Sequence, residues 1–324
     1  MQVVEWATRQ GAIVNNAISV EFNCNQGYHI TGEVASGELL IEIPAALLIN
    51  VKSLGNVPGK SHMELAKYLC TNSNPWTDSI NRVELPVFWS PAEIDLLPDK
   101  ARARILLMKQ EINDDFIQSG LSDYEKWKWA WAAVNSRCIH WKVGREGGDQ
   151  MTLAPVVDFF NHSINPDECI NIQNKLGKMQ VYASIVPQHE HLLFYGPHDN
   201  AFLLTEYGFV AENNKWDYID ITPEIELLGI NKPLLKSLGF LGEYSLTRDG
   251  PCFRTTIAIA SINASDKQLT RYVQGLDDFC IPHSTLMALY NSLDLQYMHQ
   301  QDVRHDIQLL WAGYRQILEV IDRG

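Results

Sequence analysis

The stretch Ala154–Asp167, APVVDFFNHSINPD, carries an apolar run directly into three consecutive polar side chains. The run covers residues 155–160, and Asn161, His162 and Ser163 follow it without a turn residue between. An ordinary surface loop favours Gly, Asp and Ser, and no apolar run has to precede it. Polar groups at the end of a buried segment must be hydrogen-bonded, either to the protein or to a ligand. The stretch is therefore either a satisfied polar turn beneath the core or part of a binding site.

The composition is that of a globular protein, because 46% of the 324 residues are hydrophobic and 20% are charged. This length predicts one large domain or two. The net charge of −13 argues against a nucleic-acid partner, whose phosphates attract Lys and Arg, and favours a basic protein segment. Residues 1–6 do not resemble a secretory signal, and no apolar run approaches the roughly 20 residues that span a bilayer. We expect a cytoplasmic monomer, with the nucleus as an alternative location, and no membrane partner.

The six cysteines show no C-x-x-C pair; they stand at positions 24, 70, 138, 169, 252 and 280. A structural zinc site usually takes closely spaced cysteine pairs, so this spacing argues against one. Unpaired cysteines in a protein of the reducing cytosol are reduced and mostly buried. The sequence therefore predicts free thiols and no metal.

The apolar pattern divides the chain into four successive regions. Residues 12–50 are rich in β-branched and apolar residues between Gly, Asn and Pro, as in the strands predicted at AISVEF and GELLIEIP. Residues 61–134 predict helices, residues 151–210 return to short strands and turns, and the chain is helical again from about 260. The last helix carries one apolar stripe, formed by Ile307, Leu310, Trp311, Tyr314, Leu318 and Ile321.

Two patterns predict capping boxes, in which a Ser side chain and the Glu three residues later cap the start of a helix. They are Ser61-x-x-Glu64 and Ser90-x-x-Glu93, the second with Pro91 at the first helical position. Both predictions fix where a helix begins in the region 61–134.

Four stretches in a fixed order resemble the SET-domain protein methyltransferases, in the branch typified by the Rubisco large-subunit methyltransferase. They are residues 23–44 (NCNQGYHITGEVASGELLIEIP), 134–138 (VNSRC), 158–163 (DFFNHS) and 190–209 (EHLLFYGPHDNAFLLTEYGF). The resemblance implies an α+β SET fold with a knot-like crossing in residues 1–212, with a helical insert at about 58–134. It also implies a helical substrate-binding region at 213–324.

The resemblance further implies S-adenosyl-L-methionine as cofactor and assigns residues to it and to the substrate. Cofactor-binding residues would be Cys24, Asn25, Gln26, Gly27, Arg137, Asn161, His162 and Tyr195. Substrate-binding residues would be Arg137, Asp158, Tyr195, Tyr207 and Phe209, with Tyr195 as the catalytic residue. The chain departs from the family pattern at Asn25, where the family loop has its first Gly, and at His189, where the family has Gly before Glu.

The implied reaction is methylation of a lysine in a non-histone protein. Lysine must lose its proton to react, which costs roughly 4–5 kcal/mol at pH 7. A dry channel of Tyr195, Tyr207 and Phe209 would lower the pKa of the ammonium. Aligning the reacting atoms can be worth roughly 7–11 kcal/mol, which outweighs that cost.

Three alternatives remain open from the sequence. One branch of the family methylates histidine instead of lysine. A catalytically inactive SET domain would serve as a protein-binding module. Finally, His189-Glu190-His191, with His198 nearby, places two imidazoles on the same side of a strand, as metal ligands would be.

Overall fold

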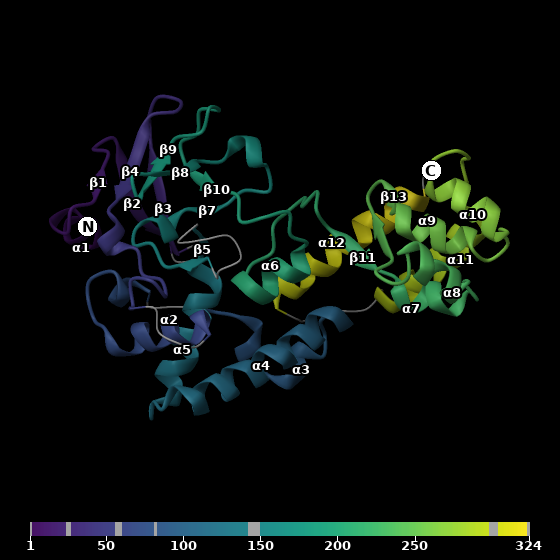
Figure 1. Cartoon of the computed structure of the whole chain (residues 1–324), viewed down its shortest axis with the longest axis horizontal. Coiled ribbons are helices and arrows are strands. Elements are labelled where there is room, and N and C mark those ends of the chain that lie inside the picture. The colour runs from purple at the N-terminus through teal and green to yellow at the C-terminus, as the bar shows by residue number, and fades with distance from the viewer. Residues whose placement is uncertain are drawn as a thin grey trace. The chain divides into compact units, whose positions relative to one another are not determined.

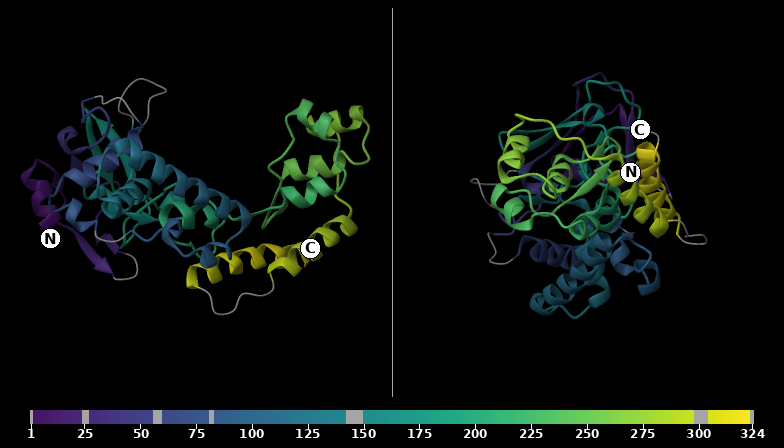
Figure 2. Two further views of the ribbon diagram at one scale, coloured as in Figure 1. Left: turned by 90° about the horizontal axis from the view of Figure 1, so that it is seen from below. Right: turned by 90° about the vertical axis from the view of Figure 1, so that its right-hand side faces the viewer.

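A computed structural model describes residues 2–23, 27–55, 60–80, 83–141, 150–297 and 304–322 (Figure 1). The chain divides into two compact units. The first comprises Met1–Trp89, Ala103–Pro197 and Thr205–Gly208, and the second Ser90–Arg102, His198–Leu204 and Phe209–Gly324. Both units contain helices and strands, which makes the fold α+β (Figures 1 and 2).

The first unit is built on small β-sheets. Its largest sheet has the order β1-β4-β9-β8 and is antiparallel throughout, with β1 at Ile13–Val14, β4 at Leu39–Ile43, β9 at Lys178–Tyr182 and β8 at Asn171–Lys175. Strands β2 (Ile18–Asn23) and β3 (Gly27–Gly32) form an antiparallel pair, as do β5 (Ile139–His140) and β6 (Met151–Thr152). The strands predicted at AISVEF and GELLIEIP are confirmed as β2 and β4.

Helices of the first unit are α1 (Gln2–Arg9), α2 (Ser61–Thr71), α5 (Tyr124–Arg137) and most of α4 (Asp99–Ser119). Helix α2 packs against α5, whose Trp127, Trp131 and Val134 are buried as the helical spacing predicts. The indole of Trp127 donates a hydrogen bond to the Ile112 carbonyl on α4, at 2.9 Å. The predicted helical region is therefore confirmed, and its tryptophans form its core.

One of the two predicted capping boxes is present. Ser90 and Glu93 cap each other reciprocally at the start of α3 (Pro91–Ile94), with Pro91 at the first helical position. At α2 the prediction is wrong, because the N-cap is Lys60 and Ser61 is already helical. Lys60 is held by Asp115, whose side chain is buried, at 3.0 Å. The helix thus starts one residue earlier than the local pattern predicts, and its N-cap residue forms a tertiary ion pair.

The second unit consists mainly of helices around a three-stranded antiparallel sheet. The sheet has the order β11-β12-β13, with β11 at Tyr218–Asp220, β12 at Ser245–Thr247 and β13 at Gly250–Pro251. The helices are α3, α7 (Thr222–Leu227), α8 (Lys232–Leu238), α9 (Phe253–Ala260), α10 (Asp266–Val273), α11 (His283–Tyr297) and α12 (His305–Asp322). The predicted stripe lies on α12, where the described members Ile307, Leu310, Trp311, Tyr314 and Leu318 are buried.

One feature went unpredicted. Helix α6 (Asn200–Tyr207) lies where short strands and turns were expected. Helix α7 lies within the helical region implied at 213–324, although the apolar pattern alone indicated helices only from about residue 260. The α6 sequence NAFLLTEY is apolar on several sides and therefore lacks the amphipathic period that identifies a surface helix.

A buried polar network closes the turn after α6 in the second unit. The Asp217 carboxylate accepts hydrogen bonds from the backbone and the side-chain amide of Asn200, at 2.6 and 2.7 Å. Asn200 in turn donates to the Ala211 carbonyl and accepts from the Ala211 N–H, both at 2.9 Å. Burial raises the pKa of the Asp217 carboxyl from 3.8 to about 6, although the hydrogen bonds from Asn200 oppose this shift.

This raised pKa predicts a pH dependence of stability. Between pH of about 4 and about 6 the folded state binds a proton at Asp217 that the unfolded state has lost. The free energy of unfolding should therefore fall as pH rises through this window. Urea unfolding of the Asp217→Asn variant should lack this part of the slope, with Asp249→Asn, an exposed position, as the control for charge loss. An unchanged slope in Asp217→Asn would contradict the assignment.

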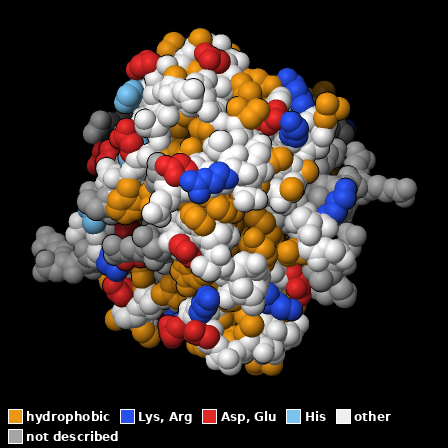
Figure 3. All heavy atoms as spheres, turned by 90° about the vertical axis from the view of Figure 1, so that its left-hand side faces the viewer, with side chains coloured by type: hydrophobic (Ala, Val, Ile, Leu, Met, Phe, Trp, Pro, Cys, Tyr) orange, Lys and Arg blue, Asp and Glu red, His pale blue; other side chains and the backbone are white. Residues whose placement is uncertain are grey.

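Several expected absences can be examined on the described residues. No helix in the described part of the chain is long and apolar enough to cross a membrane. Cys70, Cys138, Cys169, Cys252 and Cys280 are free thiols, while Cys24 lies outside the described residues. On the face of the molecule in Figure 3, Lys and Arg side chains are scattered among acidic and hydrophobic ones. The described side chains on this face therefore form no basic patch of the kind that phosphates favour.

Candidate active site

The polar residues Asn161 and His162 form a short strand that pairs with a segment 31 residues further along the chain. Strand β7 (Asn161–His162) runs parallel to β10 (Leu192–Leu193), with Asn161 opposite Leu192 and His162 opposite Leu193. The Ser163 N–H continues the ladder by donating to the Leu193 carbonyl at 3.1 Å. The apolar run at residues 155–160 is therefore followed by a strand pair in the first unit. The hydrogen bonds of this pair satisfy the backbone polar groups of the segment that follows the run.

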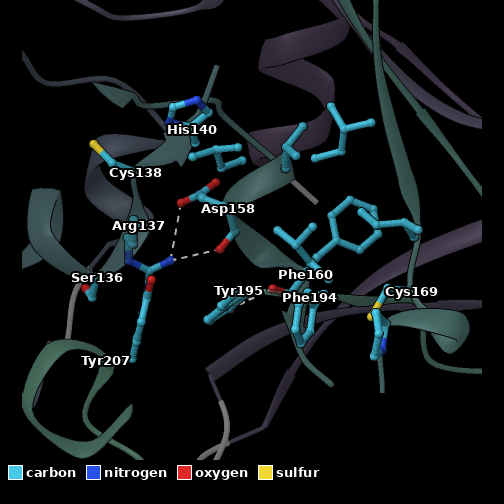
Figure 4. A pocket seen from close by; sticks show the side chains of 16 residues that line it. Ser136, Arg137, Cys138, His140, Asp158, Phe160, Cys169, Phe194, Tyr195 and Tyr207 are labelled. Atoms are coloured by element: carbon cyan, nitrogen blue, oxygen red, sulfur yellow. Dashed lines mark hydrogen bonds and ion pairs between the residues drawn. The ribbon is translucent and has the colours of Figure 1, made fainter. Parts of the chain in front are cut away.

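The backbone before β7 is strained. Val156 is fully buried and has φ +73° and ψ −39°, in a region that β-branched residues rarely adopt. Such strain persists only where the surrounding core holds it, and it is common at functional sites. A single 3-10 turn, Val157–Phe159, follows. This turn directs Asp158 toward a cavity, and Phe160 lines the same cavity immediately after it (Figure 4).

The cavity has a volume of about 320 Å³ and lies entirely within the first unit. Of the residues assigned from the sequence, it brings together Arg137, Asp158, Tyr195 and Tyr207. The other lining residues come from the end of α5, from β5 and from the segments around β7 and β10: Ser136, Cys138, Ile139, His140, Val157, Phe160, Pro166, Cys169, Ile170, Ile172, Leu193 and Phe194. Most of the residues that line the cavity are thus apolar or aromatic, and the Asp158–Arg137 ion pair and other polar atoms also face it.

The ion pair joins Asp158 to Arg137. The Arg137 guanidinium lies 3.2 Å from the Asp158 carboxylate and also donates to the Asp158 carbonyl at 3.3 Å (Figure 4). The indole N–H of Trp76 donates to the other carboxylate oxygen at 3.1 Å. The Asp158 side chain is fully buried, and burial raises its pKa, although Arg137 and Trp76 oppose the shift. Each carboxylate oxygen therefore has a donor, which fixes the carboxylate in one orientation.

Tyr195 is held at both its backbone and its hydroxyl. Its N–H donates to Nδ1 of His162 at 3.2 Å, and its hydroxyl donates to the Phe160 carbonyl at 2.8 Å. The ring lies 5.0 Å from His162 and 4.9 Å from Tyr207, measured between ring centroids. Burial raises the pKa of Tyr195 well above its ordinary value, so the hydroxyl stays protonated and remains a donor.

Tyr207, at the end of α6, is positioned through its neighbour Glu206. The Glu206 carboxylate accepts from Arg104 at 2.6 Å and from the Asn135 amide at 2.9 Å. The same Asn135 amide donates to the Glu206 carbonyl at 3.1 Å. Burial also raises the pKa of Tyr207. Helices α4 and α5 thus fix the end of α6, so that two neutral phenols flank the cavity.

The described lining of the cavity does not include the other assigned residues. Asn161 and His162 are absent from its lining and stand on β7 beside it. Gly27 begins β3 with φ +76°, while Cys24, Asn25 and Gln26 lie outside the described residues. Phe209 belongs to the second unit. Among the described residues, the cavity lining therefore contains four of the five assigned to the substrate, and Arg137 and Tyr195 of those assigned to the cofactor.

The metal alternative is not supported. Among the described residues, no group of three or more His, Cys, Asp or Glu side chains is placed to hold a metal ion. His191 is buried, whereas His189 is exposed and lies 3.3 Å from Glu33. The two imidazoles therefore occupy different environments.

Sequence reasoning missed two polar partners of the site. Trp76 is 82 residues from Asp158, and Glu190 accepts a hydrogen bond from the Asn161 amide at 3.0 Å. Glu190 stands in a stretch that carries the family resemblance, so that stretch gave a signal for it. Trp76 gave none, because nothing local to residues 72–80 indicates which distant carboxylate its indole reaches.

Comparison with known proteins gives a consistent picture, although no family model matches the chain. Ribosomal lysine N-methyltransferase set11 of Schizosaccharomyces pombe is 26% identical over 85% of this chain and 80% of its own length. Ribosomal lysine N-methyltransferase 2 of Saccharomyces cerevisiae is 30% identical over 51% of this chain, and mouse SET domain-containing protein 4 is 25% identical over 59%. The chain spans 40% and 51% of the lengths of these last two relatives.

Solved structures establish the fold. The SET domain of LSMT bound to lysine and AdoHcy aligns with a TM-score of 0.67 at 11% identity, covering 99% of this chain and 88% of that one. Rubisco LSMT bound to AdoMet aligns with a TM-score of 0.65, also at 11% identity, covering 99% and 89%. These likenesses show that the chain has the α+β SET fold of the Rubisco large-subunit enzyme, and in sequence it is similar to SET-domain protein-lysine methyltransferases.

Proposed function

We propose that this protein transfers a methyl group from S-adenosyl-L-methionine to the side-chain nitrogen of a lysine in a non-histone protein. The observation that carries the proposal is the cavity in which Tyr195 and Tyr207 stand 4.9 Å apart and which also contains the buried Asp158–Arg137 pair. The names of the relatives, two of them ribosomal lysine N-methyltransferases, support the same reaction.

The residues beside the cavity fit the cofactor. Asn161 donates its amide hydrogen to Glu190, and within the described part of the chain no donor occupies its carbonyl oxygen. Gly27 has a positive φ, and a Cβ placed there would meet nothing within 4 Å, which leaves open space at the start of β3. When bound, the cofactor supplies an electrophilic methyl group on a sulfonium. Asn161, Gly27 and Arg137 are the described residues that we propose to hold it.

The cavity suits a lysine side chain that must lose its proton. The aromatic walls are apolar and disfavour an ammonium, which lowers its pKa. Asp158 supplies a negative charge that draws the cation in, and Arg137 offsets that charge. Because the pair is nearly neutral overall, it attracts the ammonium without retaining its proton strongly. The Tyr195 hydroxyl, already directed at the Phe160 carbonyl, marks the end of the cavity where polar groups position the reacting nitrogen.

We further propose that the substrate is a ribosomal protein gripped by the region 213–324. Ribosomal proteins are basic, and the net charge of −13 favours a basic partner. The relative set11, of which this chain covers 80%, is named a ribosomal lysine N-methyltransferase.

The test is methyl transfer in vitro. The purified full-length protein, incubated with ribosomal proteins and methyl-labelled cofactor, should place the label in a protein band whose acid hydrolysate contains methyllysine. Methylhistidine would instead favour the histidine branch. Cofactor binding without any labelling, across ribosomal and total protein fractions, would favour a protein-binding module. Reactions without enzyme serve as the control.

A further inference from the structure

Glu190 and Asn161 are brought to the same face of the β7–β10 pair by strand geometry. Asn161 lies opposite Leu192 in a parallel register, so their side chains point to the same side. Glu190 precedes Leu192 by two residues, and side chains two apart on an extended segment share a face. The Asn161 amide accordingly donates to the Glu190 carboxylate at 3.0 Å.

The backbone around Glu190 is fixed on both sides by β3. Glu190 forms an antiparallel bridge with Thr31. The Gly32 N–H donates to the His189 carbonyl at 2.9 Å, and the His191 N–H donates to the Ile30 carbonyl at 2.8 Å. The residues before and after Glu190 are therefore both hydrogen-bonded to β3. This limits the freedom of the Glu190 carboxylate to move away from Asn161.

This hydrogen bond determines which way the Asn161 amide faces. A carboxylate only accepts hydrogen bonds, so the NH₂ group of Asn161 must face Glu190. The carbonyl oxygen of the same planar amide then points away from Glu190 as an acceptor. The adjacent negative charge also polarises the amide and makes that oxygen a stronger acceptor, particularly for a cation.

We infer that Glu190 is a positioning residue for the cofactor: it orients Asn161 so that the amide oxygen accepts a hydrogen bond from the α-ammonium of the methionine moiety. The inference rests on the proposed function, because it requires that the cofactor binds beside β7. The ammonium is the one cationic donor in the amino-acid part of the cofactor, and the Glu190 charge attracts it. The cofactor carboxylate, by contrast, is repelled by Glu190, so the charge also selects which end of the amino acid faces β7.

The test compares two ligands on one set of variants. The first ligand is S-adenosylhomocysteine, and the second is its deaminated analogue, in which hydrogen replaces the amino group. Glu190→Gln keeps the size of the side chain but removes its charge and its fixed preference for the NH₂ group of Asn161. By calorimetry, this variant should bind S-adenosylhomocysteine about 10-fold more weakly than wild type. Binding of the deaminated analogue should change by less than about twofold.

A double-variant cycle locates the effect at Asn161. Asn161→Ala should itself weaken binding of S-adenosylhomocysteine by about 10-fold or more, since a hydrogen bond to a charged group is lost. In that background, Glu190→Gln should have a clearly smaller effect, because there is no amide left to orient and only the attraction between the Glu190 charge and the ammonium remains. Glu33→Gln, which removes a carboxylate that is 87% exposed, is the control for net charge and should leave both affinities unchanged.

The outcomes separate the inference from the proposed function. Equal weakening of both ligands by Glu190→Gln would show a general structural role and overturn the inference, while leaving cofactor binding intact. No weakening of either ligand, or an undiminished effect in the Asn161→Ala background, would overturn it as well. If the wild-type protein binds neither ligand, the proposed function fails, and the inference fails with it. A selective weakening of S-adenosylhomocysteine binding by Glu190→Gln that becomes clearly smaller in the Asn161→Ala background supports the inference.

Discussion

Replacing Tyr195 with phenylalanine is expected to lower single-turnover methyl transfer by about 100-fold or more, while the Kd for S-adenosylmethionine changes by less than about tenfold. The substitution removes one hydroxyl and leaves the ring. That ring keeps its neighbours His162 and Tyr207, so the shape of the cavity should persist. What is lost is a hydroxyl whose O–H is held by the Phe160 carbonyl at 2.8 Å and whose oxygen can accept from the reacting groups at the place where we propose that the nitrogen and methyl group meet.

The separation of rate from affinity is the diagnostic result. A group that acts mainly in the transition state lowers turnover more than binding, whereas a structural group lowers both or neither. The two quantities should be measured on the same preparation, by rapid-quench methyl transfer and by calorimetry. Tyr182→Phe, which changes a tyrosine on β9 outside the lining of the cavity, is the matched control. Full activity in Tyr195→Phe would show that this tyrosine is structural and that the catalytic centre lies elsewhere.

Replacing Gly208 with alanine is expected to destabilise the protein by about 3 kcal/mol or more. Gly208 directly follows Tyr207 and has φ +82°, which costs an L-residue roughly 1–2 kcal/mol. A Cβ at this position would also lie 2.2 Å from the Glu84 carbonyl oxygen, so backbone would have to move. That displacement adds to the strain, and it would shift Tyr207 relative to the cavity. Urea unfolding of the full-length protein measures the loss.

Gly120→Ala is the matched control, because it isolates the backbone strain from the steric clash. Gly120 lies in the same unit, after α4, and has φ +72°, but a Cβ there would meet nothing within 4 Å. Its substitution should therefore cost only about 1–2 kcal/mol. If the two alanine variants are destabilised equally, the close approach of Gly208 to Glu84 does not contribute to stability.

Local patterns in the sequence determined much of the framework of the first unit. Strand β9 lies in the region expected to hold short strands, and its buried Met179 and Val181 alternate with more exposed residues; the helical spacing of the tryptophans after residue 123 corresponds to α5. These predictions hold because a strand or helix with one buried face repeats apolar residues at its own period. The capping box at Ser90 is equally local, since both of its hydrogen bonds lie within four residues.

The order of short motifs also indicated the site before any geometry was known. Arg137, Asp158, Tyr195 and Tyr207 were assigned by their resemblance to a family, and the structure gathers them around one cavity. Their roles in methyl transfer stay predictions, as do those of Asn161 and His162 beside the cavity and of Phe209 in the second unit. Helix α6, which carries Tyr207, was missed because an all-round apolar segment has no helical period to detect.

The sequence by itself thus determined which residue types are available for the chemistry and where most strands and helices form. Only the tertiary structure decided which of those residues meet. Trp76 reaches Asp158 across 82 positions, and Glu190 reaches Asn161 across 29, because parallel pairing of β7 with β10 and packing of the helical insert bring distant segments together. Lys60, the N-cap residue of α2, likewise reaches Asp115 across 55 positions. Contacts of this range depend on the packing of the whole unit, and a local pattern of three or four residues carries no information about them.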